Sequence, residues 1–178
     1  MNPPDLVAQI PALRRYARAL CGDAWAADDL VQDTLERACG KWRLWAVGSD
    51  LRAWLFTLMH NLHVSGLRRQ TRRSAAFTAV DIEDAAAELA APEAAQDLAL
   101  DLQRCLLRLP EEQRAVLLLV SLEDMSYAQV ARITGAPIGT VMSRLSQART
   151  RLQALMNAPA AGPQADAAPP SPHLKRLK

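Results

Sequence analysis

The sequence predicts an all-α protein made of two small helical domains. Apolar residues recur at three- and four-residue spacing in residues 27–38 and 141–155, as they do on the buried face of a helix. Only 7 of the 178 residues are Gly and 4% are aromatic, which disfavours a β-sandwich with many turns. A length of 178 residues fits one domain or two small ones, and the charge pattern favours two.

The charge pattern divides the chain into two basic blocks joined by an acidic segment. Residues 74–103 contain seven acidic side chains and no Lys or Arg, whereas the blocks on either side are net basic. From residue 157 onward the chain is rich in Pro and Ala, which a packed helix does not tolerate. We therefore expect a first domain over 1–73, an acidic, Ala-rich segment over 74–97 that forms a flexible linker or a weak helix, a second domain over 98–156 and a disordered tail over 157–178.

Three helices are expected in the first domain. The first covers residues 6–20, where Pro11 interrupts or kinks it. The second covers residues 27–38, and its polar face contains Asp28, Asp29, Gln32, Asp33 and Glu36. The third starts after Asp50, a good N-cap residue, and ends in an arginine-rich stretch over residues 67–73.

The second domain is expected to end in a helix-turn-helix motif. Helices over 98–109 and 111–122 come first; a short helix over 126–134, a turn at Gly135 and a helix opening with Pro137 follow. No acid lies between residues 139 and 151, and the outward positions of the last helix are Thr140, Ser143, Arg144, Gln147 and Arg151. Hydroxyl, amide and Arg side chains are those that a helix uses in the major groove of DNA. The alternative is an ordinary helical hairpin with a polar face.

Several classes of protein are excluded by the sequence. The longest strictly apolar run is six residues, whereas a membrane-spanning helix needs about 20, and no apolar stretch near the N-terminus is typical of a signal peptide. We therefore expect a cytoplasmic protein without direct membrane insertion, and reduced thiols at Cys21, Cys39 and Cys105. No phosphate-binding loop, nucleophile–base pair or metal cluster is recognisable, and the pair His60 and His63 lacks further ligands. We expect no enzyme, no catalytic residues, no cofactor and no metal.

Four segments, in order, have a distinctive sequence: residues 28–38 (DDLVQDTLERA), 51–57 (LRAWLFT), 109–114 (LPEEQR) and 139–145 (GTVMSRL). Together they resemble the extracytoplasmic-function (ECF) sigma factors, which are small promoter-specificity subunits of bacterial RNA polymerase. The resemblance covers about residues 5–156. It implies two helical domains, region 2 over 1–73 and region 4 over 98–156, joined by the linker.

The resemblance implies four contacts, and residues can be assigned to three of them. Region 2 binds the clamp of the β′ subunit and helps to melt the −10 element, and region 4 binds the flap of the β subunit and reads the −35 element. We assign polymerase contact to Asp29, Gln32, Asp33 and Glu36, because a carboxylate-rich face suits a basic coiled-coil partner. A melted strand needs a pocket for an extruded base and cations along its backbone, and we assign this role to Asn61, Arg68, Arg69, Arg72 and Arg73. We assign contact with the −35 element to Thr140, Ser143, Arg144, Ser146, Gln147, Arg149 and Arg151.

The partners implied by the family are bacterial core RNA polymerase, promoter DNA and an anti-sigma protein, with a monomer in isolation. The alternative is a stand-alone helix-turn-helix regulator, which would bind a palindrome as a dimer. Residues 1–73 are too short and too basic for the receiver domain of such a regulator. Trp54, in register with Leu51 and Leu55, is expected in the core rather than as a stacking platform for a base.

Overall fold

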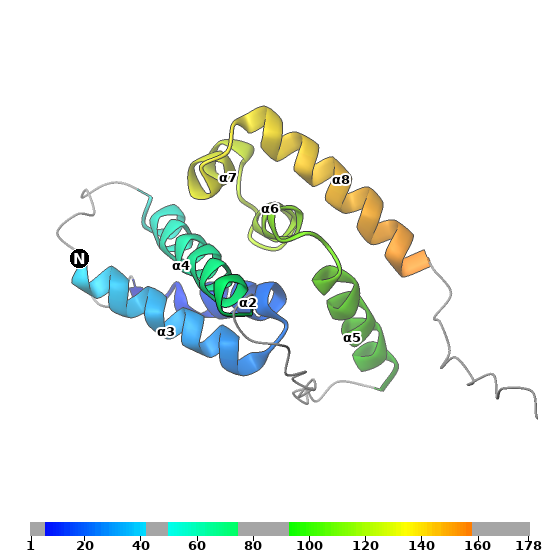
Figure 1. Cartoon of the computed structure of the whole chain (residues 1–178), viewed down its shortest axis with the longest axis horizontal. Coiled ribbons are helices and arrows are strands. Elements are labelled where there is room, and N and C mark those ends of the chain that lie inside the picture. The colour runs from blue at the N-terminus through cyan, green and yellow to red at the C-terminus, as the bar shows by residue number, and fades with distance from the viewer. Residues whose placement is uncertain (1–5, 42–49, 75–92, 158–178) are drawn as a thin grey trace, which may run out of the picture.

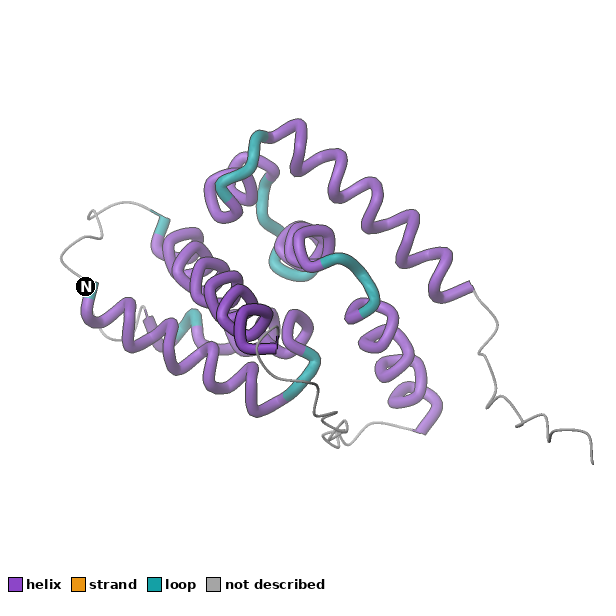
Figure 2. Tube along the Cα trace, viewed as in Figure 1, coloured by secondary structure: helices purple, strands orange, loops and turns teal. Residues whose placement is uncertain are grey.

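The computed structural model describes residues 6–41, 50–74 and 93–157, and these residues form helices and short connections (Figures 1 and 2). The predicted all-α fold is confirmed. The helices are α2 (Ile10–Cys21), α3 (Ala24–Gly40), α4 (Leu51–Ser74), α5 (Glu93–Leu107), α6 (Glu111–Ser121), α7 (Tyr127–Thr134) and α8 (Ile138–Asn157). No helix in the described ranges is both long and apolar enough to cross a bilayer.

Most helix ends lie where the local sequence placed them. Asp23 caps α3, with a carboxylate oxygen 2.7 Å from the backbone nitrogen of Ala26, and Asp50 caps α4 in the same way at 3.0 Å from that of Ala53. Each carboxylate accepts a backbone N–H that the first helical turn leaves without a partner. As predicted, the helix expected over 6–20 is interrupted next to Pro11, because residues 6–7 are helical, residues 8–9 form a turn and α2 begins at Ile10. Pro11 lies in the first turn of α2, where its missing N–H costs no hydrogen bond.

The helix-turn-helix motif is present in α7 and α8. Ser126 caps α7 through a capping box with Gln129. Gly135 ends α7 with a left-handed φ of 66°, which lets the chain turn sharply into α8 without the steric penalty of a side chain. Val141 and Leu145 of α8 are buried, as the sequence predicted for this stripe.

The expected linker and tail fall mostly outside the described residues. The helix expected from residue 98 begins at Glu93, inside the segment assigned to the linker, and residues 75–92 are not described. The tail beyond residue 157 and residues 42–49 are likewise outside the described ranges. The proposed domain boundaries therefore stay a prediction.

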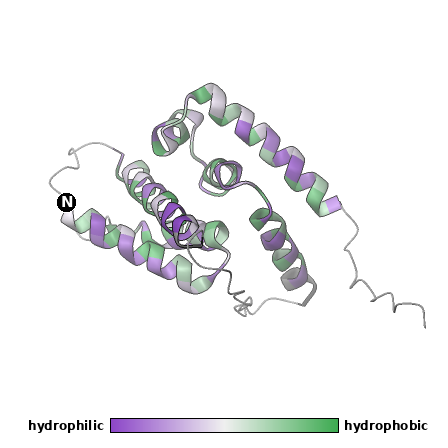
Figure 3. Cartoon of the chain, in the orientation of Figure 1, coloured by the Kyte–Doolittle hydropathy of each residue, from purple (hydrophilic) through white to green (hydrophobic). Residues whose placement is uncertain are grey.

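The two helical domains pack against each other. In Figure 1, α2, α3 and α4 lie on one side and α5 to α8 on the other, with α6 facing α2 and α7 facing α4. Buried residues of both groups form one hydrophobic cluster, and hydrophilic residues mark the outer helix faces (Figure 3). Leu107 of α5 lies so close to Gly22, at the end of α2, that a Cβ built on this glycine would be 2.5 Å from a Leu107 methyl carbon. Each small core is therefore completed by the other domain.

Candidate nucleic-acid interface

The outer face of α3 presents the residues assigned to polymerase contact. The four side chains Asp29, Gln32, Asp33 and Glu36 are all exposed. Gln32 Nε2 donates a hydrogen bond to a Glu36 carboxylate oxygen at 3.0 Å. The opposite face of α3 is buried against α2 and α4. We call the exposed row, together with Trp25, the α3 stripe.

Trp25 was missed by the sequence reasoning. Its side chain is 81% exposed, the largest exposed fraction among the exposed large hydrophobic residues of the described chain. It precedes Asp29 by four residues and Gln32 by seven, so all three lie on one face of the helix. That helical spacing was the available signal. Trp54, by contrast, is half-buried and packs against the hydrophobic cluster, as expected.

The second half of α4 presents the side chains assigned to the −10 element. Asn61, Arg68, Arg69 and Arg72 are exposed, and Arg69 Nε donates to the Ser65 carbonyl oxygen at 3.4 Å. The side chain of Arg73 lies outside the described residues, although its backbone is helical. These positions form a basic row along one helix, as expected for a surface that follows a phosphate backbone.

A cavity of about 280 Å³ lies beside this row, between α4 and the second domain. It is lined by His60, Val64, Leu67, Arg68, Glu111, Glu112, Thr134 and Arg144. Asn61 is not among the lining residues. Arg68 therefore lines this cavity and Asn61 does not, and the assignment of both to the −10 element stays a prediction.

His60 is buried and His63 is half-buried, and the two make different contacts. His63 Nε2 lies 2.6 Å from a Glu111 carboxylate oxygen, and its Nδ1 lies 3.9 Å from Cys21 Sγ. Burial raises the pKa of the Cys21 thiol to about 11, so the reactive thiolate is scarce at neutral pH. No group of three potential metal ligands occurs in the described parts of the chain.

Burial lowers the pKa of His60 below the ordinary value of 6.5, and repulsion by His63 and Arg144 adds to this while Glu111 and Glu112 oppose it. The folded protein therefore holds His60 neutral, whereas the unfolded chain takes up a proton as the pH falls through 6.5. We expect the free energy of unfolding to fall between pH 7.5 and 5.5, because the unfolded state binds more protons. Thermal unfolding across this range should show a smaller pH dependence for His60→Gln than for the unchanged chain.

The pH range in this experiment separates the histidine from nearby carboxylates. Burial acts to raise the pKa of Glu111, but the hydrogen bonds and charges of His63 and Arg114 together outweigh burial and hold the pKa below 4.5. The backbone N–H of Ala53 holds the pKa of Asp50 below 3.8. Both carboxylates stay ionised above pH 5.5, so an unchanged pH dependence in His60→Gln would contradict the assignment to His60.

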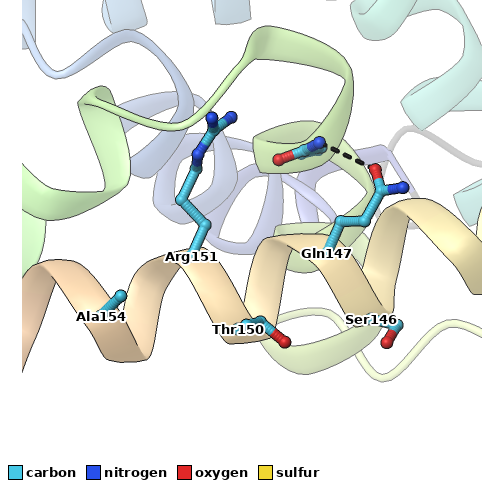
Figure 4. Close-up of a pocket in the computed structure, with 6 residues that line it drawn as sticks. Ser146, Gln147, Thr150, Arg151 and Ala154 are labelled. Carbon is cyan, nitrogen blue, oxygen red and sulfur yellow. Dashed lines mark hydrogen bonds between the residues drawn. The ribbon is translucent and has the colours of Figure 1, made fainter.

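The residues assigned to the −35 element lie on both sides of α8. Ser143, Ser146, Gln147, Arg149 and Arg151 are exposed, while Thr140 and Arg144 are half-buried. Arg144 forms an ion pair with Glu112 of α6. Gln113 Nε2 donates to Gln147 Oε1 at 3.0 Å, and Figure 4 shows Gln147 and Arg151 on the side of α8 that faces α6, with Thr150 and Ser146 on the other side.

The assigned side chains of α8 can form hydrogen bonds and ion pairs with DNA. No acidic residue lies on α8, so its charged groups are all cationic. Arginine and glutamine side chains form paired hydrogen bonds with base edges, and arginine also binds phosphates. In this structure Arg144 and Gln147 are engaged by α6, so both would exchange an internal partner for DNA.

Comparison with known proteins identifies two family models within the chain. Residues 6–60 match the sigma2 domain of PhyR, and residues 99–152 match sigma-70 region 4. The ECF RNA polymerase sigma factor EcfG of Rhodopseudomonas palustris is 37% identical over 155 residues, which cover 85% of this chain and 83% of EcfG.

Two solved structures extend the similarity to the fold. The sigma factor RpoE of Bartonella quintana, in complex with the anti-sigma factor NepR, is 36% identical with a TM-score of 0.76; the match covers 87% of this chain and 96% of RpoE. CnrH in complex with the cytosolic domain of CnrY is 26% identical with a TM-score of 0.62, over 87% of each chain. The sequence motifs, the two helical domains and these similarities agree, and the chain belongs to the family of ECF RNA polymerase sigma factors.

Proposed function

We propose that this chain binds core RNA polymerase through region 2 and directs it to promoters that it reads at two elements. The observation that carries the proposal is the helix-turn-helix of α7 and α8, whose second helix presents polar and cationic side chains and no acid. In this role the chain binds and positions other molecules and performs no reaction of its own. The stand-alone regulator is not favoured, because region 2 and region 4 models match in the expected order.

The α3 stripe is the proposed contact with polymerase. Three carboxylates and an exposed tryptophan lie along one helix face that region 4 leaves uncovered, since α3 packs on α2 and α4. Carboxylates complement a basic helical partner and speed its encounter. An exposed Trp is the kind of side chain that supplies much of the binding energy of an interface. We assign the clamp of the β′ subunit to this stripe and the flap of the β subunit to region 4.

Replacing Trp25 by alanine is expected to weaken binding to core polymerase by roughly 10- to 100-fold, the usual range for a hot-spot aromatic residue. The side chain is 81% exposed, so its removal leaves no cavity in the core. Competition against labelled chain for core polymerase measures the effect. Val7→Ala, at another exposed apolar side chain of region 2, is the control and should bind as the unchanged chain does. Equal affinities for Trp25→Ala and the unchanged chain would contradict the role of Trp25.

An anti-sigma protein is the proposed regulator. The similar sigma factor RpoE has been solved with the anti-sigma factor NepR, and the similar protein CnrH with the cytosolic domain of CnrY. We propose that this chain, a cytoplasmic monomer in isolation, is held inactive by a protein of that kind.

Run-off transcription tests the proposed function. Purified bacterial core polymerase is incubated with and without the chain on a library of promoter fragments. We expect transcripts only with the chain, from fragments that share paired −35 and −10 elements. Selection of a palindrome by the chain alone, without engagement of core polymerase, would overturn the proposal in favour of a dimeric regulator.

A further inference from the structure

A buried carboxylate joins the two domains. Glu123, in the turn after α6, is fully buried. Arg15 of α2 donates to both of its oxygens, from Nε at 3.1 Å and from Nη2 at 3.0 Å. Arg52 of α4 donates a third hydrogen bond at 2.6 Å. Both arginines belong to region 2 and the glutamate to region 4, so all three charged hydrogen bonds cross the domain interface.

Further polar contacts surround this ion-pair cluster. Gln129 Nε2 donates to an Asp50 carboxylate oxygen at 2.7 Å, and His63 contacts Glu111 at 2.6 Å. Near Gly22, the side chain of Gln103 donates to the backbone carbonyl oxygen of Arg18 at 3.0 Å. Besides the Glu123 cluster, the interface therefore contains three polar contacts, which lie between the start of α4 and the end of α2.

This closed arrangement brings the two proposed DNA-reading helices together. Arg68 of α4 and Arg144 of α8 line the same cavity of about 280 Å³. The −35 and −10 elements are about 25 base pairs apart by their names, which is about 85 Å along B-form DNA at 3.4 Å per base pair. Helices that line one small cavity cannot contact elements so far apart, so the closed chain cannot read both.

We propose that Glu123, Arg15 and Arg52 form a latch that holds the free chain closed, and that opening of this interface precedes promoter recognition. The effect of opening on promoter recognition rests on the proposed function, whereas the latch itself is a property of the chain alone. A buried carboxylate is costly without its partners, and domain separation would return Glu123 to water. If the latch is weakened, separation of the domains is enough to relieve the cost of the buried carboxylate, so we expect the domains to open rather than to unfold.

The surroundings of the latch suit a reversible switch. A chain as long as residues 75–92, between α4 and α5, can span at most about 65 Å, so the two domains can separate while connected. The α3 stripe is exposed in the closed form, so polymerase can bind region 2 before the chain opens. Opening would then free Arg144 and Arg68 from their shared cavity.

Energy transfer between two dyes on the full chain tests the latch without polymerase or DNA. One dye is attached to Cys39, which is exposed on α3, and the other to a cysteine introduced by Met156→Cys on α8. Cys21 and Cys105 are replaced by alanine in every sample. We expect one high-transfer, closed population for the chain with an unchanged latch.

The latch variant is Arg15→Gln combined with Arg52→Gln, which keeps part of each aliphatic stem and leaves Glu123 without a charged partner. We expect the ratio of open to closed molecules to rise by about tenfold or more. The control is Arg14→Gln with Arg18→Gln, which removes two exposed charges from the same domain and should stay closed. Adding Glu123→Gln to the latch variant removes the stranded charge and should shift the population back towards the closed form.

Three outcomes would overturn the latch: low energy transfer in the chain with an unchanged latch, a latch variant as closed as its control, or a triple variant as open as the latch variant. Unlabelled variants are also assayed by run-off transcription. Opening of the latch variant with no transcription from the unchanged chain would sustain the latch and refute the proposed function. Transcription by the unchanged chain, with equal energy transfer in the latch variant and its control, would support the proposed function and refute the latch.

Discussion

Charge reversal of Asp29 and Asp33 to lysine is expected to lower run-off transcription by about 100-fold or more at limiting chain concentration. Both carboxylates are exposed on α3, and neither is required by the fold. Like charges placed opposite each other in an interface cost several kcal/mol, and a 100-fold loss of affinity needs only about 2.8 kcal/mol. Neutralisation of the same two residues to asparagine should give a smaller loss, because it removes attraction without adding repulsion.

The matched control for this prediction is Asp97→Lys with Asp101→Lys. These two residues are exposed on α5, and their reversal changes the net charge of the chain by the same amount. We expect transcription within about threefold of the unchanged chain, since surface substitutions outside an interface have small effects. If both double variants lose activity equally, net charge rather than the α3 stripe determines polymerase binding. Thermal unfolding of both variants checks that the fold is retained.

Local sequence signals were sufficient for most of the fold. Apolar spacing and cap residues placed α3, α4, α6, α7 and α8 to within a few residues, because these signals act within one turn of the helix they define. The start of α5 at Glu93 was missed, because the Ala-rich, acidic sequence there has no apolar stripe. Pro11 correctly predicted an interruption of the first helix, because a proline breaks the helix that precedes it and suits the first turn of the helix that follows.

Contacts between the domains could not be predicted in this way. Arg15 and Arg52 lie 108 and 71 residues from Glu123 along the chain, and no spacing rule connects them. In the sequence, Glu123 is one of two adjacent acids between two helices, and its complete burial depends on how the two cores pack. Asn61 was assigned to a base pocket from its position in a motif. The cavity beside α4 is lined by side chains of both domains, so its position could not be predicted from that motif. Site residues on one helix face were accessible to sequence reasoning, whereas contacts between domains were not.

Replacing Arg144 and Gln147 by alanine is expected to lower transcription by about 10- to 100-fold from a promoter that depends on its −35 element. Each good side-chain contact with a base pair is worth about 1–3 kcal/mol of discrimination. The same variant should transcribe almost normally from a promoter that does not require a −35 element. Transcription from the two promoters, at matched chain concentration, measures the effect. Equal loss from both would place these residues in polymerase binding or in folding rather than in base recognition.

Two controls separate DNA contact from the internal partners of these side chains. Gln153→Ala, at an exposed position further along α8, should leave both promoters unaffected. Glu112→Gln removes the ion-pair partner of Arg144, and because Glu112 is 70% exposed in that pair, its loss should cost at most about 1 kcal/mol of stability. If Arg144 contacts DNA, Glu112→Gln should maintain or raise transcription, because the arginine no longer exchanges a carboxylate for its DNA partner. A loss from Glu112→Gln as large as that from the alanine pair would instead show that the ion pair itself, by orienting α8 against α6, is what transcription requires.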